Sequence, residues 1–177
     1  RIVKPTLNAL KKEKKHYTGF LYVGLMIKNN EPYLIEFNVR MGDPECQVIL
    51  PRLKTDLLKI INCSTQNKLK NIRIKWSEEK CMTVVLCSKG YPGKYKKNIE
   101  IEELEKIKKD KKDFIFHAGT QIKDGKLVST GGRVLNFTSI GKNLLNVRRK
   151  IIKMIKKLNW KNGFYRKDIG WKIISKR

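Results

Sequence analysis

The sequence is poor in the residues that make metal centres and disulfide frameworks. It has four cysteines and two histidines in 177 residues. Cys46, Cys63, Cys81 and Cys87 form no C-x-x-C pair, so no zinc site is expected, and reduced thiols in a cytoplasm are the simpler interpretation. No apolar run approaches the roughly eighteen residues needed to cross a bilayer, so no membrane partner is expected.

No secretory signal is expected from the first residues of the sequence. It opens with Arg1, and residues 1–7 do not show the charged, then apolar, then small-residue order of a signal peptide. We therefore expect a piece of a longer, cytoplasmic protein. The length allows one large domain or two small ones.

Acidic residues are scarce. There are 16 Asp and Glu against 41 Lys and Arg, which gives a formal net charge of +25. Such a charge suggests attraction to nucleic-acid phosphates. However, the lysines are scattered, arginine is uncommon, and no helix-turn-helix, zinc-finger or RNP pattern is present. We expect no specific nucleic-acid partner, although a non-enzymatic nucleic-acid-binding module remains the alternative from another class.

The first third of the chain predicts a β-hairpin. Residues 19–27 are continuously apolar and β-rich, as in a strand buried on both faces. Residues 29–32 supply a turn, and residues 33–39 predict the second strand.

Two helix starts follow the hairpin. In the first, Asp43 is placed as N-cap, Pro44 at the first helical position and Glu45 in the first turn. The second, at Thr55-Asp56, leads into a short apolar stripe. Residues 64–80 are polar and poorly periodic, so we expect a linker there between one domain at 1–63 and another at 81–177.

The second domain is predicted to mix strands and one long helix. Asp124-Gly125 predicts a type I′ hairpin turn, and apolar spacing predicts an amphipathic helix over 142–158 with a solvated basic face. Strands are expected at 82–88, 114–118, 121–123, 127–129 and 133–138.

Polar side chains alternate along the second strand of the predicted hairpin. Glu36, Asn38 and Arg40 are two residues apart, so their side chains leave one face of a strand at intervals of about 7 Å. A carboxylate and an amide oxygen suit Mg²⁺, and an arginine beside them can stabilise a transferring phosphoryl group. Taken alone, the same residues fit an ordinary solvent-facing strand edge modestly better.

Longer motifs of the sequence resemble those of a known enzyme family. The sequence from Tyr17 to Met26 and from Glu36 to Gln47 resembles the catalytic end of the ATP-grasp fold in glycinamide ribonucleotide synthetases. The resemblance extends to that family's C-terminal domain and covers essentially the whole chain through Lys89-Gly90-Tyr91-Pro92-Gly93, Phe116-His117-Ala118-Gly119-Thr120, Gly131-Gly132-Arg133-Val134-Leu135 and Tyr165-Arg166-Lys167-Asp168-Ile169-Gly170. It implies an α+β fold: the C-terminal half of an ATP-grasp domain, with an antiparallel sheet and helices, followed by a small mixed β/α domain.

The resemblance also implies a reaction and its cofactor. Glu36 and Asn38 would hold Mg²⁺, or Mn²⁺, against the phosphates of ATP, and Arg40 would face the phosphoryl group. Glycine and ATP would give glycyl phosphate, and the amino group of phosphoribosylamine would attack it to form the amide, ADP and phosphate. No protein nucleophile is required.

Five further residues are candidates for substrate contacts. Gly132 and Arg133 could approach a ribose phosphate through backbone amides and a guanidinium, with Lys89 adding charge. Asp43 is explained better as a helix cap, and His117 is about as well explained as a structural histidine. For Lys89 and Arg133 the alternative is a cation on a tight turn, and Arg133 is the stronger candidate.

Several parts of the family pattern are missing. The N-terminal substrate domain, the lid that grips the nucleotide and the first part of the catalytic sheet would all precede Arg1. We therefore expect this chain to be inactive alone and to need the missing N-terminal portion of the same enzyme. Another ATP-grasp ligase or carboxylase is the nearest rival, but it would lack the motifs of the second domain.

Overall fold

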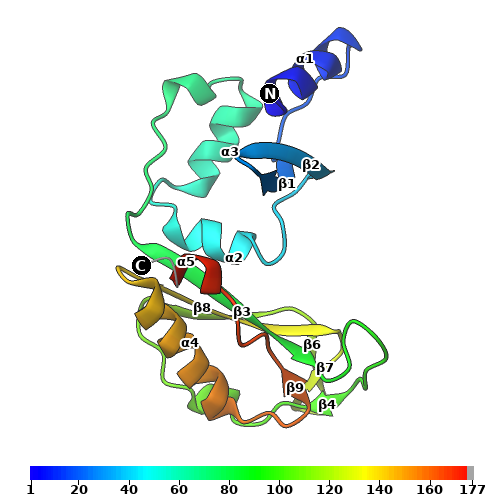
Figure 1. Cartoon of the computed structure of the whole chain (residues 1–177), viewed down its shortest axis with the longest axis vertical. Helices are drawn as coiled ribbons and strands as arrows, with labels where there is room; N and C mark the ends of the chain where they lie inside the picture. The colour runs from blue at the N-terminus through cyan, green and yellow to red at the C-terminus, as the bar shows by residue number, and fades with distance from the viewer. Residues whose placement is uncertain (175–177) are drawn as a thin grey trace. The chain divides into compact units, whose positions relative to one another are not determined.

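The computed structural model describes residues 1–174 (Figure 1). The chain divides into two compact units. Unit 1 contains residues 1–46 and 53–76, and unit 2 contains residues 47–52 and 77 onward. Helices and antiparallel sheets occur together, which confirms the predicted α+β class.

Unit 1 is built around a two-stranded sheet with short helices. No side chain in its helices is fully buried. Its elements are α1 (Val3–Lys12), β1 (Tyr22–Lys28), β2 (Glu31–Asn38), α3 (Leu57–Thr65) and the 3₁₀ turn η2 (Leu69–Asn71).

The hairpin prediction is confirmed, but the turn is shorter than predicted, because Glu31 and Pro32 belong to β2. Lys28 pairs with Glu31, and the two turn residues, Asn29 and Asn30, both have positive φ (51° and 61°), as a type I′ turn requires. The predicted burial of the first strand on both faces is wrong. The strand begins at Tyr22, and the side chains of its second half are exposed because nothing in the described part of the chain, residues 1–174, covers them.

The helix predicted to start at Asp43 begins later. Residues 43–45 form a turn, and α2 covers Cys46–Ile49, followed by the 3₁₀ turn η1 (Leu50–Arg52). The Cys46 amide donates to the Gly42 carbonyl at 2.9 Å, so the first helical hydrogen bond spans the Asp-Pro-Glu turn instead of starting inside it. The prediction that the helix starts directly after Asp43, with Pro44 at the first helical position, is therefore wrong.

The second predicted helix start is confirmed. Asp56 caps α3 by accepting a hydrogen bond of 2.8 Å from the Lys59 amide. The segment after α3 returns to its beginning, since the Lys54 amide donates to the Lys75 carbonyl at 2.9 Å and Leu53 forms a β-bridge with Trp76.

Unit 2 contains two antiparallel sheets and one long helix. The four-stranded sheet has the order β5-β8-β3-β9, and the three-stranded sheet has the order β4-β7-β6. The strands are β3 (Lys80–Ser88), β4 (Ile99–Glu100), β5 (Asp113–His117), β6 (Thr120–Lys123), β7 (Lys126–Ser129), β8 (Arg133–Gly141) and β9 (Gly163–Phe164); the helices are η3 (Leu104–Lys106), α4 (Leu144–Leu158) and α5 (Trp171–Ile174).

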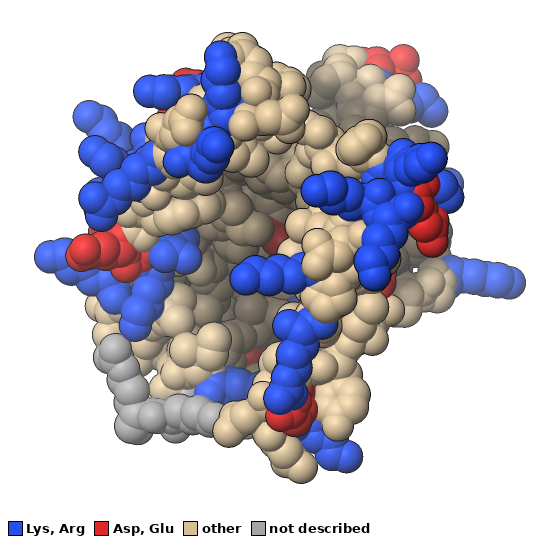
Figure 2. Space-filling view, turned by 90° about the horizontal axis from the view of Figure 1, so that it is seen from above, with Lys and Arg blue, Asp and Glu red and all other residues tan. Residues whose placement is uncertain are grey.

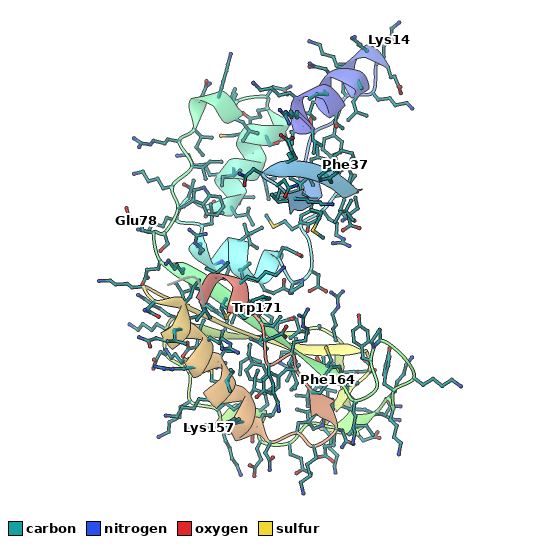
Figure 3. All side chains as sticks on the ribbon, viewed as in Figure 1. Lys14, Phe37, Glu78, Lys157, Phe164 and Trp171 are labelled. Atoms are coloured by element: carbon teal, nitrogen blue, oxygen red, sulfur yellow. The ribbon has the colours of Figure 1, made fainter. Side chains whose placement is uncertain are left out.

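The core of unit 2 lies between the larger sheet and α4. Alternate residues of β3 are buried, and they pair across the sheet with buried residues of β8. The helix contributes the apolar stripe that its spacing predicts, while Lys157 projects away from the sheet (Figure 3). Burial of these side chains is the main stabilising contribution to the unit. The core residues include Val84, Leu86, Leu135, Phe137, Val147, Ile151 and Met154.

The hairpin turn predicted at Asp124-Gly125 is confirmed. The β6–β7 turn has positive φ at Asp124 (49°) and Gly125 (75°), as type I′ geometry requires. Asn143 caps α4, accepting from the Leu145 amide at 2.8 Å. In the part of the chain that the structure describes, no helix is long and apolar enough to cross a membrane.

Candidate functional site

The end of β2 holds the first candidate site. The Asn38 side-chain amide donates a hydrogen bond of 3.0 Å to Glu36 Oε1, so both side chains lie on one face of the strand as predicted. Gly24 lies opposite Glu36 on β1, where a β-carbon would be 3.0 Å from Glu36 Cγ. The missing side chain at Gly24 therefore leaves the space in which Glu36 lies.

A second carboxylate lies close to this pair. The Tyr22 hydroxyl donates to Glu45 Oε1 at 3.4 Å, and a β-carbon at Gly42 would come within 2.3 Å of Glu45 Oε2. Burial, then the Glu45 carboxylate and finally the Glu36 carboxylate raise the pKa of Tyr22. The sequence interpretation missed Tyr22 and treated Glu45 only as a helix-start residue. The spacing of three residues between Gly42 and Glu45 was the sequence signal that could have indicated this contact.

Arg40 and Asp43 do not share the strand face. Because β2 ends at Asn38, Arg40 lies beyond it, and its Nη1 donates to the Met41 carbonyl at 2.8 Å. The expectation that all three polar residues project from one strand face is therefore wrong for Arg40. Asp43 lies exposed in the turn before α2.

The donors at the end of β2 suit a hard cation with few protein ligands. Within residues 1–174 no group of three or more His, Cys, Asp or Glu side chains is placed to hold a metal ion. Glu36 and Asn38 offer a carboxylate and an amide oxygen side by side, and Glu36 is exposed. This set fits Mg²⁺, which typically keeps waters and uses one or two protein groups with substrate phosphates.

The second group of candidate residues lies at one end of the larger sheet of unit 2. Three turns meet there, and glycines at the contact points leave no side chains between the backbones. Ser88 donates through its amide to the Gly132 carbonyl and through its hydroxyl to the Gly131 carbonyl, both at 2.8 Å. A β-carbon at Gly119 would lie 2.6 Å from the Gly131 Cα, so the two backbones are in direct contact.

Arg133 is the first residue of β8 at this end, and Gly132 directly precedes it. Gly132 is buried under Tyr91, whose ring would be 2.1 Å from a β-carbon at position 132. Arg133 pairs with Cys87 across a β-bulge whose extra residue is Val134. Burial raises the pKa of the Cys87 thiol, and the positive charge of Arg133 opposes that effect. The Gly131 amide donates a hydrogen bond of 3.3 Å to the Gly119 carbonyl, so this amide already has a partner within the protein.

The structure places Lys89 and His117 at the same end of the sheet. His117 is the exposed last residue of β5, and its Nδ1 lies 2.9 Å from Thr120 Oγ1. The Lys89 amide donates to the Asn162 carbonyl at 2.8 Å, and the residue lines a cavity. Four of the predicted substrate residues therefore meet in unit 2, whereas Asp43 belongs to unit 1.

Positive charge is spread over the face that Figure 2 draws. On the face drawn in Figure 2, Lys and Arg side chains project at many separate points, and Asp and Glu appear at a few. This distribution agrees with a lysine-rich composition more than with one designed basic patch.

Two family models match the chain. Residues 1–46 match "Phosphoribosylglycinamide synthetase, ATP-grasp (A) domain", which places the hairpin and its Glu36–Asn38 pair in an ATP-grasp domain. Residues 81–172 match "Phosphoribosylglycinamide synthetase, C domain". The chain belongs to the phosphoribosylglycinamide synthetase family.

Relatives agree with this assignment. The chain is 45% identical over 175 residues to phosphoribosylamine-glycine ligase of Agrobacterium fabrum, covering 99% of this chain and 41% of the relative. It is 44% identical over 175 residues to the trifunctional purine biosynthetic protein adenosine-3 of Gallus gallus, covering 98% of this chain and 17% of that protein. The crystal structure of phosphoribosylamine-glycine ligase from Thermotoga maritima matches with a TM-score of 0.76 and 35% identity, covering 92% of this chain and 40% of that one. The chain thus spans well under half the length of these relatives.

Proposed function

We propose that this chain is the C-terminal part of an ATP-dependent ligase that joins glycine to phosphoribosylamine. The observation that supports the proposal most directly is the Glu36–Asn38 pair at the end of β2, within a segment that matches an ATP-grasp domain. The relative that shares 45% identity is named for this activity, and the relative that shares 44% identity is named as a purine biosynthetic protein. The required partner is the missing N-terminal portion of the same enzyme, and the proposed location is the cytoplasm.

In the proposed reaction the glycine carboxylate attacks the γ-phosphate of ATP, giving glycyl phosphate and ADP. The phosphoribosylamine nitrogen then attacks the acyl carbon, and phosphate leaves as the amide forms. Glu36 and Asn38 would hold Mg²⁺ or Mn²⁺, which when bound supplies positive charge against the nucleotide phosphates. The protein contributes charge, orientation and exclusion of water, and no protein nucleophile.

Each remaining candidate has a defined task in this proposal. Arg40 releases the Met41 carbonyl and turns its guanidinium toward the phosphoryl group, for which its exposed position leaves room. Arg133 binds the phosphate of phosphoribosylamine as a bidentate donor, with Gly132, Lys89 and His117 at the same end of the sheet as secondary contacts. Asp43, which lies exposed in the turn before α2, is proposed to contact substrate.

The test is to join this chain to the upstream region of a relative and measure ADP release. We expect release that depends on Mg²⁺, glycine and phosphoribosylamine in the joined protein, and none from the 177-residue chain alone. A joined protein that folds but releases ADP independently of glycine would contradict the proposed substrates. Glycine-dependent release by the chain alone would contradict the assignment of missing parts.

A further inference from the structure

A cavity of about 310 Å³ lies between the last turn of α4 and the segment that follows this helix in unit 2. Its volume falls at the lower end of the range of small-molecule sites, roughly 300–1,000 Å³. None of the residues that line it has a task in the proposed ligase reaction. Most of its wall is apolar or aromatic, with side chains from Leu86, Ile155, Trp160, Phe164 and Tyr165.

The apolar part of the cavity combines buried and exposed surface. Leu86 and Ile155 belong to the core between the larger sheet and α4, and they are 3% and 5% exposed. Phe164 is held at the edge of that sheet by its pairing with Cys87, yet 38% of its surface is exposed. An exposed ring beside a core that is already packed leaves apolar surface for a ligand to remove from water.

The Trp160 ring forms a wall whose orientation is fixed. Its Nε1 donates to the Glu100 carbonyl at 2.9 Å. A β-carbon at Gly163 would come within 2.4 Å of the ring, so the absence of a side chain at position 163 lets the backbone and the indole lie this close. A wall that is already ordered loses little entropy when a ligand binds.

The segment that follows α4 and leads to β9 is tied to the helix at both of its ends (Figure 1). Asn159 reverses the chain with a φ of 47°, in the left-handed region. Farther along, Arg148 of α4 donates a hydrogen bond through Nη2 to the Lys167 carbonyl. The cavity between the helix and this segment is therefore preformed.

The charge around the cavity has one sign. Lys156 and Lys167 line it, and none of the described residues that line it is an Asp or Glu. Within residues 1–174 neither lysine forms an ion pair, and Asp168, next to Lys167, is paired with Arg166 at 2.7 Å. From residue 125 to residue 167 the sequence contains no Asp or Glu. A positive potential beside apolar walls favours a ligand that is anionic at one end and apolar at the other.

We propose that this cavity binds a small carboxylic acid with an apolar body, an aryl or alkyl carboxylate. The apolar body lies against Leu86, Trp160 and Phe164, and the ammonium groups of Lys156 and Lys167 hold the carboxylate. Both lysines are exposed, so a carboxylate between them stays in contact with water while the body of the ligand is covered.

The groups that commonly hold a phosphate are missing from this cavity. Among residues 1–174 no arginine lines it, and the Gly163 amide already donates to the Trp160 carbonyl at 3.0 Å. The cavity is also separate from the candidate substrate contacts. Leu86 points to the side of the sheet that α4 covers, whereas Arg133 and its partner Cys87 belong to the opposite face. The proposal is therefore tested independently of the ligase reaction.

The test follows the indole N–H signals of the three tryptophans by NMR while phenylacetate is added to the complete 177-residue chain at neutral pH. We expect a saturable shift of the Trp160 signal and none for Trp76 or Trp171, which lie outside the cavity. The two exposed tryptophans report any general adsorption to apolar surface.

Two double variants test the role of the lysines. Lys156→Ala/Lys167→Ala removes the charge that lines the cavity, and Lys153→Ala/Lys157→Ala removes the same charge from exposed positions of α4 outside it. We expect the first to bind phenylacetate at least about fivefold more weakly and the second to change binding less than about twofold. Thermal unfolding of each variant confirms that it is folded.

Analogues of the probe separate the two halves of the proposed ligand. Phenylethanol, which has no charge, is expected to bind at least about fivefold more weakly than phenylacetate. Acetate and glycine, which have no apolar body, are expected to give no saturable shift. Phenylethanol binding as tightly as phenylacetate, or acetate or glycine shifting the Trp160 signal as phenylacetate does, would overturn the proposal. Equal losses in the two double variants, or no saturable shift of the Trp160 signal, would overturn it as well.

Discussion

Asn38 donates a hydrogen bond of 3.0 Å to the carboxylate of Glu36, two residues earlier on β2. The bond orients the carboxylate toward the end of the strand and keeps an amide oxygen beside it. Space for this arrangement comes from Gly24 on the neighbouring strand, which has no side chain to press on Glu36.

Replacing Gly24 with Ala tests that packing. The new β-carbon would lie 3.0 Å from Glu36 Cγ, so the carboxylate must shift by a few tenths of an ångström. In the joined enzyme we expect the Mg²⁺ concentration for half-maximal rate to rise about three- to tenfold with little change in thermal stability, because ligand placement is sensitive to small shifts. An unchanged Mg²⁺ dependence would show that Glu36 does not need this space.

Gly119→Ala tests the contact between two backbones in unit 2. A β-carbon there would lie 2.6 Å from Gly131 Cα and 2.8 Å from the Arg133 carbonyl oxygen, and neither group is a flexible side chain. We expect the free energy of unfolding to fall by about 2–4 kcal/mol. Gly125→Ala is the control, because no atom lies within 4 Å of its β-carbon and only its φ of 75° is unfavourable, costing about 1 kcal/mol. Equal losses for the two variants in urea unfolding would contradict the backbone contact.

The Asp113 carboxylate makes stability depend on pH. Burial by itself would raise its pKa, but hydrogen bonds from Ser139, the Asp110 amide and Lys150 outweigh burial and lower the pKa. A carboxyl group whose pKa is lower in the folded state contributes stability above its unfolded pKa of about 3.9 and loses it as pH falls through the folded pKa.

We therefore expect Asp113→Asn to lower the free energy of unfolding by about 2 kcal/mol at pH 7, since the side chain is 2% exposed and Lys150 is only partly buried. The variant should also lose part of the decline in stability below pH 4. Asp168→Asn, at an exposed ion pair with Arg166, serves as the control and should change unfolding little. Identical pH profiles for Asp113→Asn and the parent chain, measured by urea unfolding, would rule out this role.

The Cys81 thiol is expected to react slowly. Burial raises its pKa to about 11 despite the opposing charge of Arg52, from a usual value of 9.0. The thiolate fraction near pH 8 is then about a hundredfold smaller than in the unfolded chain, and only the thiolate is nucleophilic. Alkylation by iodoacetamide followed by peptide mass analysis should label Cys81 about a hundredfold faster in urea than in the native protein. Comparable native and unfolded rates would contradict its protected position.

Signals between neighbouring residues predicted much of the fold. The hairpin turns were predicted at Asn29-Asn30 and at Asp124-Gly125, because those residue types tolerate positive φ. The spacing of apolar residues predicted α4, and Asp56 predicted the start of α3. The burial of β1 was wrong because a continuous apolar strand is the same in sequence whether or not further strands cover it.

The candidate site was only partly predictable, because part of it depends on strand ends and on contacts between residues that are distant in sequence. The alternation of Glu36 and Asn38 follows from strand geometry, and the structure confirms that the two side chains share a face. The exclusion of Arg40 depends on where the strand ends, and the approach of Tyr22 to Glu45 depends on how a strand meets a turn 23 residues later. The contact between Gly119 and Gly131 likewise requires the register of β8 with its neighbours, which sequence spacing does not specify.

The most direct measurement of the central claim is the rate of glycine- and phosphoribosylamine-dependent ADP release by the joined enzyme carrying Glu36→Gln. Gln keeps the size of the side chain but removes the negative charge that a divalent cation needs. Glu13→Gln, at an exposed position after α1, is the matched control. We predict a loss of at least about a hundredfold for Glu36→Gln and no loss for Glu13→Gln. Equal activity of the two variants at low Mg²⁺ would contradict the assignment of Glu36 as a metal ligand of the ligase.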